Sequence, residues 1–228
     1  MIEVLNDGYI RLVDSMGDDN SIIRSARVSH DGDTRTGVDK AGDAKLMGFL
    51  YRNGHNTPFE SVSVQFEVKA PIFVLRQWMR HRTWSYNEVS ARYTELEETY
   101  FVPEIGDIGV QSTRNKQASM RNKGTVTRDT RVQNIIYHAN SESFETYKKL
   151  LVDGVPREIA RSVLPLAMYT RMYAKVDLSN LFKFLNERLA EDAQPEIRVY
   201  AEAIVKLVEP VAPVAVAAFL KSRETQDE

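Results

Sequence analysis

The chain has 228 residues and a mass of 26.0 kDa, enough for one large domain with a sizeable core. Hydrophobic residues make up 43% and charged residues 27%, an ordinary globular composition that excludes a disordered chain. With 30 Lys and Arg against 32 Asp and Glu, the formal net charge is -2, so no overall positive field attracts nucleic acid or anionic lipid.

The amino terminus carries acidic residues early and lacks the basic-then-apolar order of a signal peptide. The longest apolar stretch, residues 211–220, contains Pro213 and is too short to span a bilayer. We therefore expect a cytoplasmic protein without membrane contact.

The first half of the chain predicts three helices and one strand. Asn20 can cap a short helix that carries Ile22 and Ile23, and a second helix over residues 44–51 is closed by Gly54. The segment SVSVQFEVK, residues 61–69, alternates apolar and polar side chains and predicts a strand. Pro71 then opens a helix over residues 71–80 that ends at Arg80.

The second half predicts mainly helices. Residues 106–130 are polar and aperiodic, which indicates a long loop or insert. The periodicity then predicts a long helix from Val132 to Gly154, a short one over 156–161, a second strand over 164–176, and three final helices over 181–189, 195–208 and 214–220. We expect a helix-rich α+β protein, with a single catalytic domain over 1–221, a small, mostly antiparallel sheet, an insert at 106–130 and a charged tail at 222–228.

Common catalytic motifs are absent from the sequence. It contains no HExxH, GxSxG, Walker or GxGxxG pattern, so a zinc peptidase, a serine hydrolase and a Rossmann or P-loop site are all disfavoured. The four histidines are widely spaced, and we predict no metal site. The chain also lacks cysteine, which excludes a thiolate nucleophile.

One segment concentrates positive charge. RQWMRHRTWSYNEVSARY, residues 76–93, holds four arginines against the single acid Glu88. Arginine forks suit phosphate oxygens, and Ser85, Asn87 and Ser90 can fix the orientation of a ligand. We interpret the segment as an anion pocket; the alternative is a solvated basic turn. Trp84, Tyr86 and Tyr93 could stack on a planar ligand or serve only in packing.

This segment resembles the RHR-x7-S motif of flavin-dependent thymidylate synthases, with Arg80, His81 and Arg82 followed by Ser90. Four other segments resemble the same family in the same order: GHNTPFE (54–60), VKAPIFVLRQW (68–78), GVPREIARSVLP (154–165) and FLNERLAEDAQPEI (184–197). The resemblance therefore covers most of the chain.

The resemblance implies a mixed α/β homotetramer whose flavin and nucleotide sites lie between subunits. The family makes dTMP from dUMP, with 5,10-methylenetetrahydrofolate as carbon donor, FAD as redox carrier and NADPH as reductant, and releases tetrahydrofolate. The missing cysteine agrees with this chemistry, because reduced flavin can deliver hydride where a thiolate would otherwise add to the pyrimidine.

The resemblance also implies roles for individual residues. Those expected around dUMP are Gln77, Arg80, Glu88, Ser90, Arg92, Arg161 and Arg188, with Ser90, Arg92 and Arg161 at its phosphate. Arg188 is the expected catalytic residue, since a permanent cation favours ionised uracil. Those expected around FAD are Ser29, His55, Thr57, Arg80, His81, Arg82, Asn87, Glu88, Asp177, Ser179 and Lys183, with His55 near the folate or flavin side.

Three residues depart from the family pattern. Asp177, Lys183 and Asp192 stand where Asn, Asn and His are commoner, and all three are expected on the flavin side. They leave open a related flavin-dependent enzyme that methylates or hydroxymethylates another pyrimidine nucleotide. A nucleic-acid-binding module with a basic face over residues 76–128 is a further alternative, which the net charge disfavours.

Overall fold

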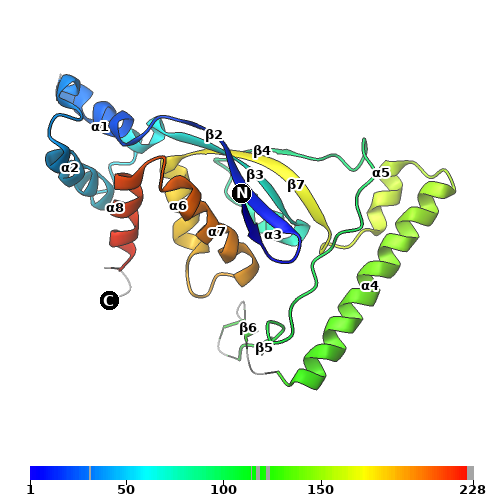
Figure 1. The fold of residues 1–228 in the computed structure, drawn as a ribbon. Coiled ribbons are helices and arrows are strands. Elements are labelled where there is room, and N and C mark those ends of the chain that lie inside the picture. Colours follow the sequence, from blue (N-terminus) through cyan, green and yellow to red (C-terminus); the bar gives the residue numbers. More distant parts are fainter. Residues whose placement is uncertain (31, 114, 117–118, 122–123, 225–228) are drawn as a thin grey trace.

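The computed structural model describes residues 1–30, 32–113, 115–116, 119–121 and 124–224. Its main feature is a five-stranded sheet in the order β1-β2-β3-β7-β4 (Figure 1). The strands are β1 Ile2–Val4, β2 Gly8–Met16, β3 Ser63–Pro71, β7 Tyr169–Asp177 and β4 Ser85–Glu88. Every neighbouring pair is antiparallel. This confirms the predicted α+β class and its antiparallel sheet.

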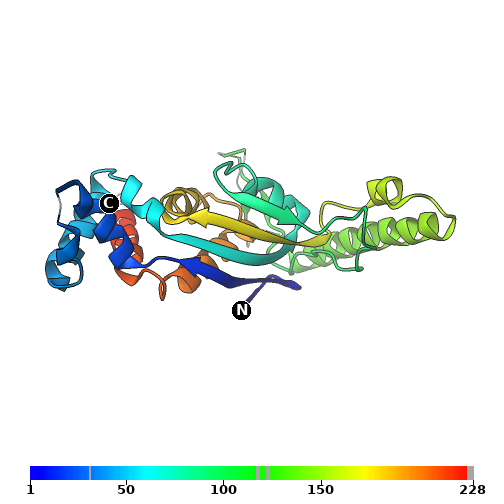
Figure 2. The same cartoon turned by 90° about the horizontal axis from the view of Figure 1, so that it is seen from above.

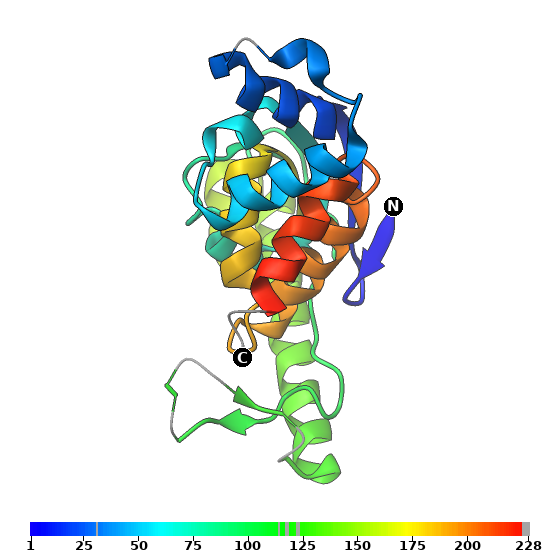
Figure 3. The same ribbon diagram turned by 90° about the vertical axis from the view of Figure 1, so that its left-hand side faces the viewer.

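The helices lie below one face of this sheet and at its two ends (Figure 1). They are α1 Asp19–Arg27, α2 Lys40–Arg52, α3 Ile72–Trp78, α4 Val126–Val152, α5 Arg157–Ala160, α6 Leu178–Arg188, α7 Pro195–Val208 and α8 Pro213–Glu224. Short 3-10 turns complete the set: η1 Val28–His30, η2 Asp33–Arg35, η3 Thr57–Ser61 and η4 Arg161–Val163. Figure 1 shows α6 and α7 below the sheet, and Figure 3 shows α2 and α8 packed side by side at one end of the molecule.

The core forms where the apolar face of the sheet meets these helices. In β3, Val64, Phe66 and Val68 are buried, as alternation predicts, and Phe66 is paired with Ala174 of β7. Buried side chains of α1, α2, α3, α6, α7 and α8 complete the same cluster. One prediction for β7 is wrong: Leu166 is 56% exposed, because residues 166–167 form a turn before the strand begins at Tyr169.

The start of α1 also differs from the prediction. Its cap is Asp18 and not Asn20, because the Asp18 carboxylate accepts a hydrogen bond from the backbone N–H of Ser21 at 3.0 Å. The Ser21 hydroxyl in turn accepts from the backbone N–H of Asp18 at 3.2 Å. This reciprocal capping box satisfies two donors, which a cap at Asn20 would leave unpaired.

The polar insert contains more structure than predicted. A small hairpin pairs β5 Val110–Gln111 with β6 Ser119–Met120, and α4 begins at Val126 instead of Val132, since Thr125 caps it. The long helix leaves the main body (Figure 1) and has its own small core with α5, around Phe144 and Tyr147. Residues 222–224 of the predicted tail belong to α8, and 225–228 lie outside the described residues.

Within the described ranges, none of the helices combines the length and the apolar character that crossing a bilayer requires.

Candidate active site

The candidate site is formed by two helices, each of which follows a central strand without an intervening loop. Pro71 ends β3 and caps α3, and Asp177 ends β7 and caps α6, so neither helix is separated from its strand by a loop. The two helices meet where Trp78 packs on Phe184, with 5.0 Å between ring centroids. Their carboxyl ends therefore bring His81 and Arg188 together.

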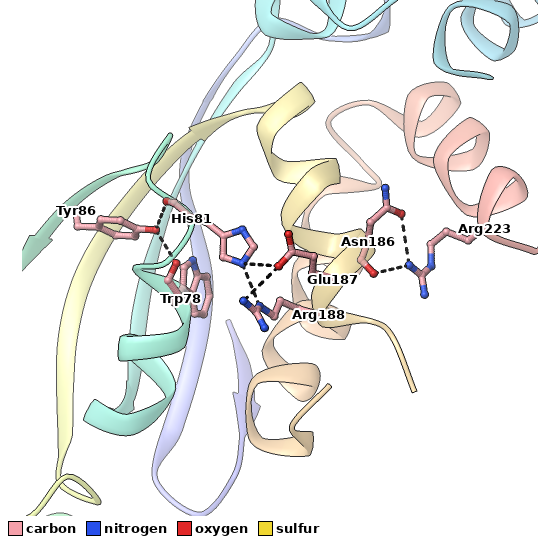
Figure 4. A network of polar contacts seen from close by, with 7 residues as sticks. All are labelled: Trp78, His81, Tyr86, Asn186, Glu187, Arg188 and Arg223. Carbon is pink, nitrogen blue, oxygen red and sulfur yellow. Dashed lines mark hydrogen bonds and ion pairs between the residues drawn. The ribbon is translucent and has the colours of Figure 1, made fainter. Parts of the chain in front are cut away.

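His81 and Arg188 form a polar contact with Glu187 (Figure 4). Nε of Arg188 donates to Nε2 of His81 at 3.0 Å, and Glu187 lies 3.7 Å from the same imidazole nitrogen. Nη2 of Arg188 is 3.4 Å from the Glu187 carboxylate. Burial, together with the neighbouring Arg188 charge, lowers the pKa of His81, and Glu187 opposes this shift. The neutral imidazole is thus the favoured form.

The other residues at the end of α3 present cations and an amide. Arg80 and Arg82 flank His81 and are exposed, and neither forms an ion pair within the part of the chain that the structure describes. Gln77 donates a hydrogen bond to Gln194 at the start of α7. The carboxyl end of α3 therefore offers two guanidinium groups to an anion beside the neutral His81.

The strand β4 carries a second group of predicted residues. Asn87 and Glu88 are exposed on it, and the backbone N–H of Arg92 donates to Oγ of Ser90 at 3.3 Å in the turn that follows. Arg92 lies 3.6 Å from Glu158, with both side chains more than half exposed. Because Glu158 lies on α5 and Arg161 follows that helix in η4, Ser90, Arg92 and Arg161 belong to one region.

The aromatic residues of this segment are divided between packing and solvent. Trp84 is buried against Trp78 and Phe184. The Tyr86 hydroxyl donates to the backbone carbonyl oxygens of Trp78 and His81, both at 3.0 Å (Figure 4), and burial raises its pKa. These two aromatics fix the turn that carries His81, whereas Tyr93 is 78% exposed.

The predicted flavin residues outside the motif lie around η1, η3 and the start of α6. Ser29 is in η1, Thr57 begins η3, and the His55 ring stacks on Phe49 at 5.8 Å. The elements η3 and α6 are in contact. On α6, Lys183 Nζ is 3.3 Å from Asn180, and the buried Oγ of Ser179 has no hydrogen-bond partner among the described residues.

The presence of aspartate at position 177, where the family pattern has asparagine, has a structural explanation. Its carboxylate accepts from the backbone N–H of Asn180 at 2.9 Å and from the Asn180 amide at 2.6 Å, so it caps α6. Asp192 lies in the turn between α6 and α7, where it lines a pocket of about 580 Å³.

The structure separates some residues that were predicted to share a ligand. Arg188 ends α6 near the middle of the molecule, whereas Arg161 lies beside α5 at the far end (Figures 1 and 2). One chain alone therefore does not bring the two arginines together. Three further polar residues, Glu187, Asn186 and Gln194, were missed, because each is an ordinary exposed helix or turn residue in sequence.

Comparison with known proteins places this geometry in a family. Residues 11–214 match the model of the family described as thymidylate synthase complementing protein. The flavin-dependent thymidylate synthase of Thermus thermophilus is 49% identical, over 96% of this chain and 77% of the relative. That of Thermotoga neapolitana is 43% identical, over 96% and 94%.

A solved structure has the same fold as this chain. The UMP/dUMP methylase PolB of Streptomyces cacaoi, crystallised with 5-Br dUMP, is 34% identical and superposes with a TM-score of 0.87, covering 96% of this chain and 97% of the other. A family match across nearly the whole chain, an RHR motif held against Arg188 and the same fold lead to one conclusion: the chain belongs to the flavin-dependent thymidylate synthases.

Proposed function

We propose that the enzyme converts dUMP to dTMP with 5,10-methylenetetrahydrofolate as carbon donor, FAD as its flavin and NADPH as reductant. The observation that carries the proposal is the contact between His81 of the RHR motif and Arg188, the residue expected to face uracil. Relatives named flavin-dependent thymidylate synthases, 49% and 43% identical, support it.

The residues fit a flavin nucleotide in two respects. Arg80 and Arg82 are exposed cations suited to its phosphates. The buried Oγ of Ser179, which has no partner within the described ranges, lies on the helix that also carries Lys183 and Arg188. We assign FAD to these residues, with Ser29, His55, Thr57, His81, Asn87, Glu88 and Asp177. When bound, reduced flavin supplies the hydride that replaces thiolate chemistry in a chain without cysteine.

For dUMP, Ser90, Arg92 and Arg161 would hold the phosphate, and Gln77, Arg80, Glu88 and Arg188 the nucleoside. Arg188 stabilises the anionic form of the pyrimidine. The neutral His81 accepts a hydrogen bond from Nε of Arg188. It so fixes the direction of the guanidinium fork without adding a competing charge.

We propose a homotetramer in which these sites are shared between subunits. The separation of Arg161 from Arg188 supports shared sites. One face of α4 supports a subunit interface: Val126 and Ile135 are 71% and 60% exposed, and both line an open groove of about 740 Å³.

Mixing two impaired variants tests the shared site. At low dUMP concentration Arg161→Ala and Arg188→Ala should each have strongly reduced activity, and co-refolding them should restore part of it, because some sites then combine two intact residues. If the sites lie within single chains, mixing restores none. Light scattering should show a tetramer, which Ile135→Glu should weaken.

A second candidate substrate is UMP, because the superposed PolB is described as a UMP/dUMP methylase. Isotope-labelled dUMP and UMP, each with methylenetetrahydrofolate, FAD and NADPH, distinguish the two. We expect dTMP from dUMP only when the complete mixture is present. Formation of no methylated product from either nucleotide, aerobically and anaerobically, would refute the proposed function.

A further inference from the structure

Gln194, at the start of α7, has a side chain that does not serve its own helix. It is the N-cap residue of α7, yet its side chain makes no capping hydrogen bond within the described part of the chain. Short side chains such as serine and aspartate are the usual caps, because they reach the backbone N–H groups of the first turn. The Gln194 Oε1 instead accepts a hydrogen bond from Nε2 of Gln77 at the end of α3.

The backbone around Gln194 is held on both sides. One turn into α7, Nη2 of Arg198 donates to the backbone carbonyl oxygen of Ala193 at 2.8 Å and also to that of Glu191. Pro195 occupies the first helical position, where its ring fixes φ. The Gln194 side chain therefore extends toward Gln77 from a backbone with little freedom to move.

The two helices that carry these glutamines are also fixed relative to each other. Trp78, next to Gln77, packs on Tyr200 of α7 with 6.0 Å between ring centroids, and both side chains are fully buried. Gln77 precedes Arg80, the first residue of the RHR motif, by three positions, which is about one helical turn. The hydrogen bond from Gln77 to Gln194 thus lies at the end of α3 that carries the motif.

This hydrogen bond restricts what Gln77 can present to a ligand. A glutamine amide carries both a donor and an acceptor, and an amide without partners can rotate to present either one. Because the amide is planar, engaging its Nε2 at Gln194 also fixes the direction of its carbonyl oxygen. A side chain that is ordered before the ligand arrives loses less conformational entropy when the ligand binds.

We propose that Gln194 is a positioning residue for the pyrimidine nucleotide and acts through Gln77. The inference rests on the proposed function, which assigns Gln77 to the nucleoside of dUMP, and deepens it by adding a residue of α7 to that site. The contribution of Gln194 is to nucleotide binding. Flavin binding and the chemical step do not depend on it.

Gln194→Ser separates this role from a role in folding. Serine is too short to reach Gln77 but is a better N-cap than glutamine, so the variant should have a Tm equal to or above that of the wild type. Its Kd for dUMP should rise about 2- to 12-fold, the effect of one hydrogen bond between uncharged groups. The Kd for FAD and kcat at saturating dUMP should not change. A folded variant with the wild-type Kd for dUMP would overturn the inference.

A double-mutant cycle tests whether Gln194 acts through Gln77. Gln77→Met keeps the length of the side chain and removes its hydrogen bonds, so adding Gln194→Ser to it should change the Kd for dUMP no further. Independent effects that multiply in the double variant would contradict the proposal. Calorimetry on the FAD-loaded enzyme measures all four proteins.

Gln133 provides a matched control. Its amide donates to the backbone carbonyl oxygen of Pro103 at 2.8 Å from α4, so Gln133→Ser also removes a glutamine hydrogen bond, but away from Gln77. This variant should bind dUMP and FAD as the wild type does. A loss of dUMP affinity equal to that of Gln194→Ser would show that the effect is not specific to Gln194.

Failure of this inference is distinguishable from failure of the proposed function. If the wild type forms dTMP and Gln194→Ser binds dUMP equally well, the positioning role is wrong and the proposed function stands. If the wild type neither binds dUMP nor forms dTMP, the proposed function is wrong and the positioning role falls with it.

Discussion

Nε of Arg188 lies 3.0 Å from Nε2 of His81, although the two residues are 107 positions apart in sequence. An arginine always donates, so Nε2 is the acceptor and the imidazole proton resides on Nδ1. His81, which is expected at the flavin, and Arg188, which is expected at the uracil, are thus in direct contact. Protonation of His81 would place two cations against each other.

The first prediction concerns pH and His81. Its pKa in the folded protein is lowered from the ordinary 6.5, so below about pH 6.5 the unfolded chain binds more protons. The contribution of neutral His81 to the free energy of unfolding is present in full above pH 6.5. It is lost as the pH falls through the lower pKa that His81 has in the folded protein. Urea unfolding at pH 7.5 and 5.5, at fixed protein concentration, should show a smaller pH difference for His81→Gln than for wild type. His30→Gln, at an exposed position in η1, is the control and should behave as wild type.

The second prediction concerns Arg188. Arg188→Ala should lower kcat by about 10²- to 10³-fold, the usual effect of removing one group that stabilises developing charge, while the Kd for dUMP changes less. Arg188→Lys should recover part of the rate, because it keeps the charge and loses only the fork geometry. Single-turnover kinetics with flavin reduced beforehand would measure this step; a normal rate in the alanine variant would remove the catalytic assignment.

The third prediction concerns the phosphate of dUMP. Arg92→Ala and Arg161→Ala should each weaken dUMP binding by about 1.5–3 kcal/mol, the range for a charge-assisted contact. Glu158→Gln should tighten it, because this carboxylate lies 3.6 Å from Arg92 and competes for the guanidinium. Calorimetry with dUMP and with deoxyuridine provides the comparison. Equal losses for both ligands would contradict a phosphate role.

The fourth prediction concerns Asp177 at the start of α6. Asp177→Ala should lower the free energy of unfolding by about 1 kcal/mol, because the backbone N–H of Asn180 loses its partner. Asp177→Asn should be nearly neutral, since asparagine caps as well as aspartate. Thermal and urea unfolding measure both. A stable alanine variant would show that the cap contributes nothing to folding.

The sequence was informative where one side chain pattern decides the structure. Alternation in β3 and β7 predicted these two strands, because their buried faces are apolar except for Thr170. The strands β1, β2 and β4 were missed. They lie outside that central pair, and most of β4 is exposed, so the pattern of burial in β4 carries no signal. The hairpin of β5 and β6 is held by two residue pairs, too few for a periodicity.

The candidate site was predictable only in part for a related reason. The RHR segment is contiguous and stands out by its charge, whereas the contact between His81 and Arg188 depends on tertiary packing of Trp78 against Phe184. Glu187 acquires a role only because the ends of α3 and α6 meet at His81, and Asn186 is contacted only because α2, α6 and α8 converge. No local pattern encodes that convergence.

The pairing of β3 with β7 has a consequence for how the chain can vary in length. The chain that connects these neighbouring antiparallel strands runs from α3 to η4 and includes the insert and α4. In terms of chain entropy, this whole region is one long closed loop. The entropy of closing a loop grows only logarithmically, and doubling its length costs about 0.6 kcal/mol. Residues can therefore be added to or removed from the insert at little cost to the sheet, and the distance between His81 and Arg188 stays fixed by α3 and α6.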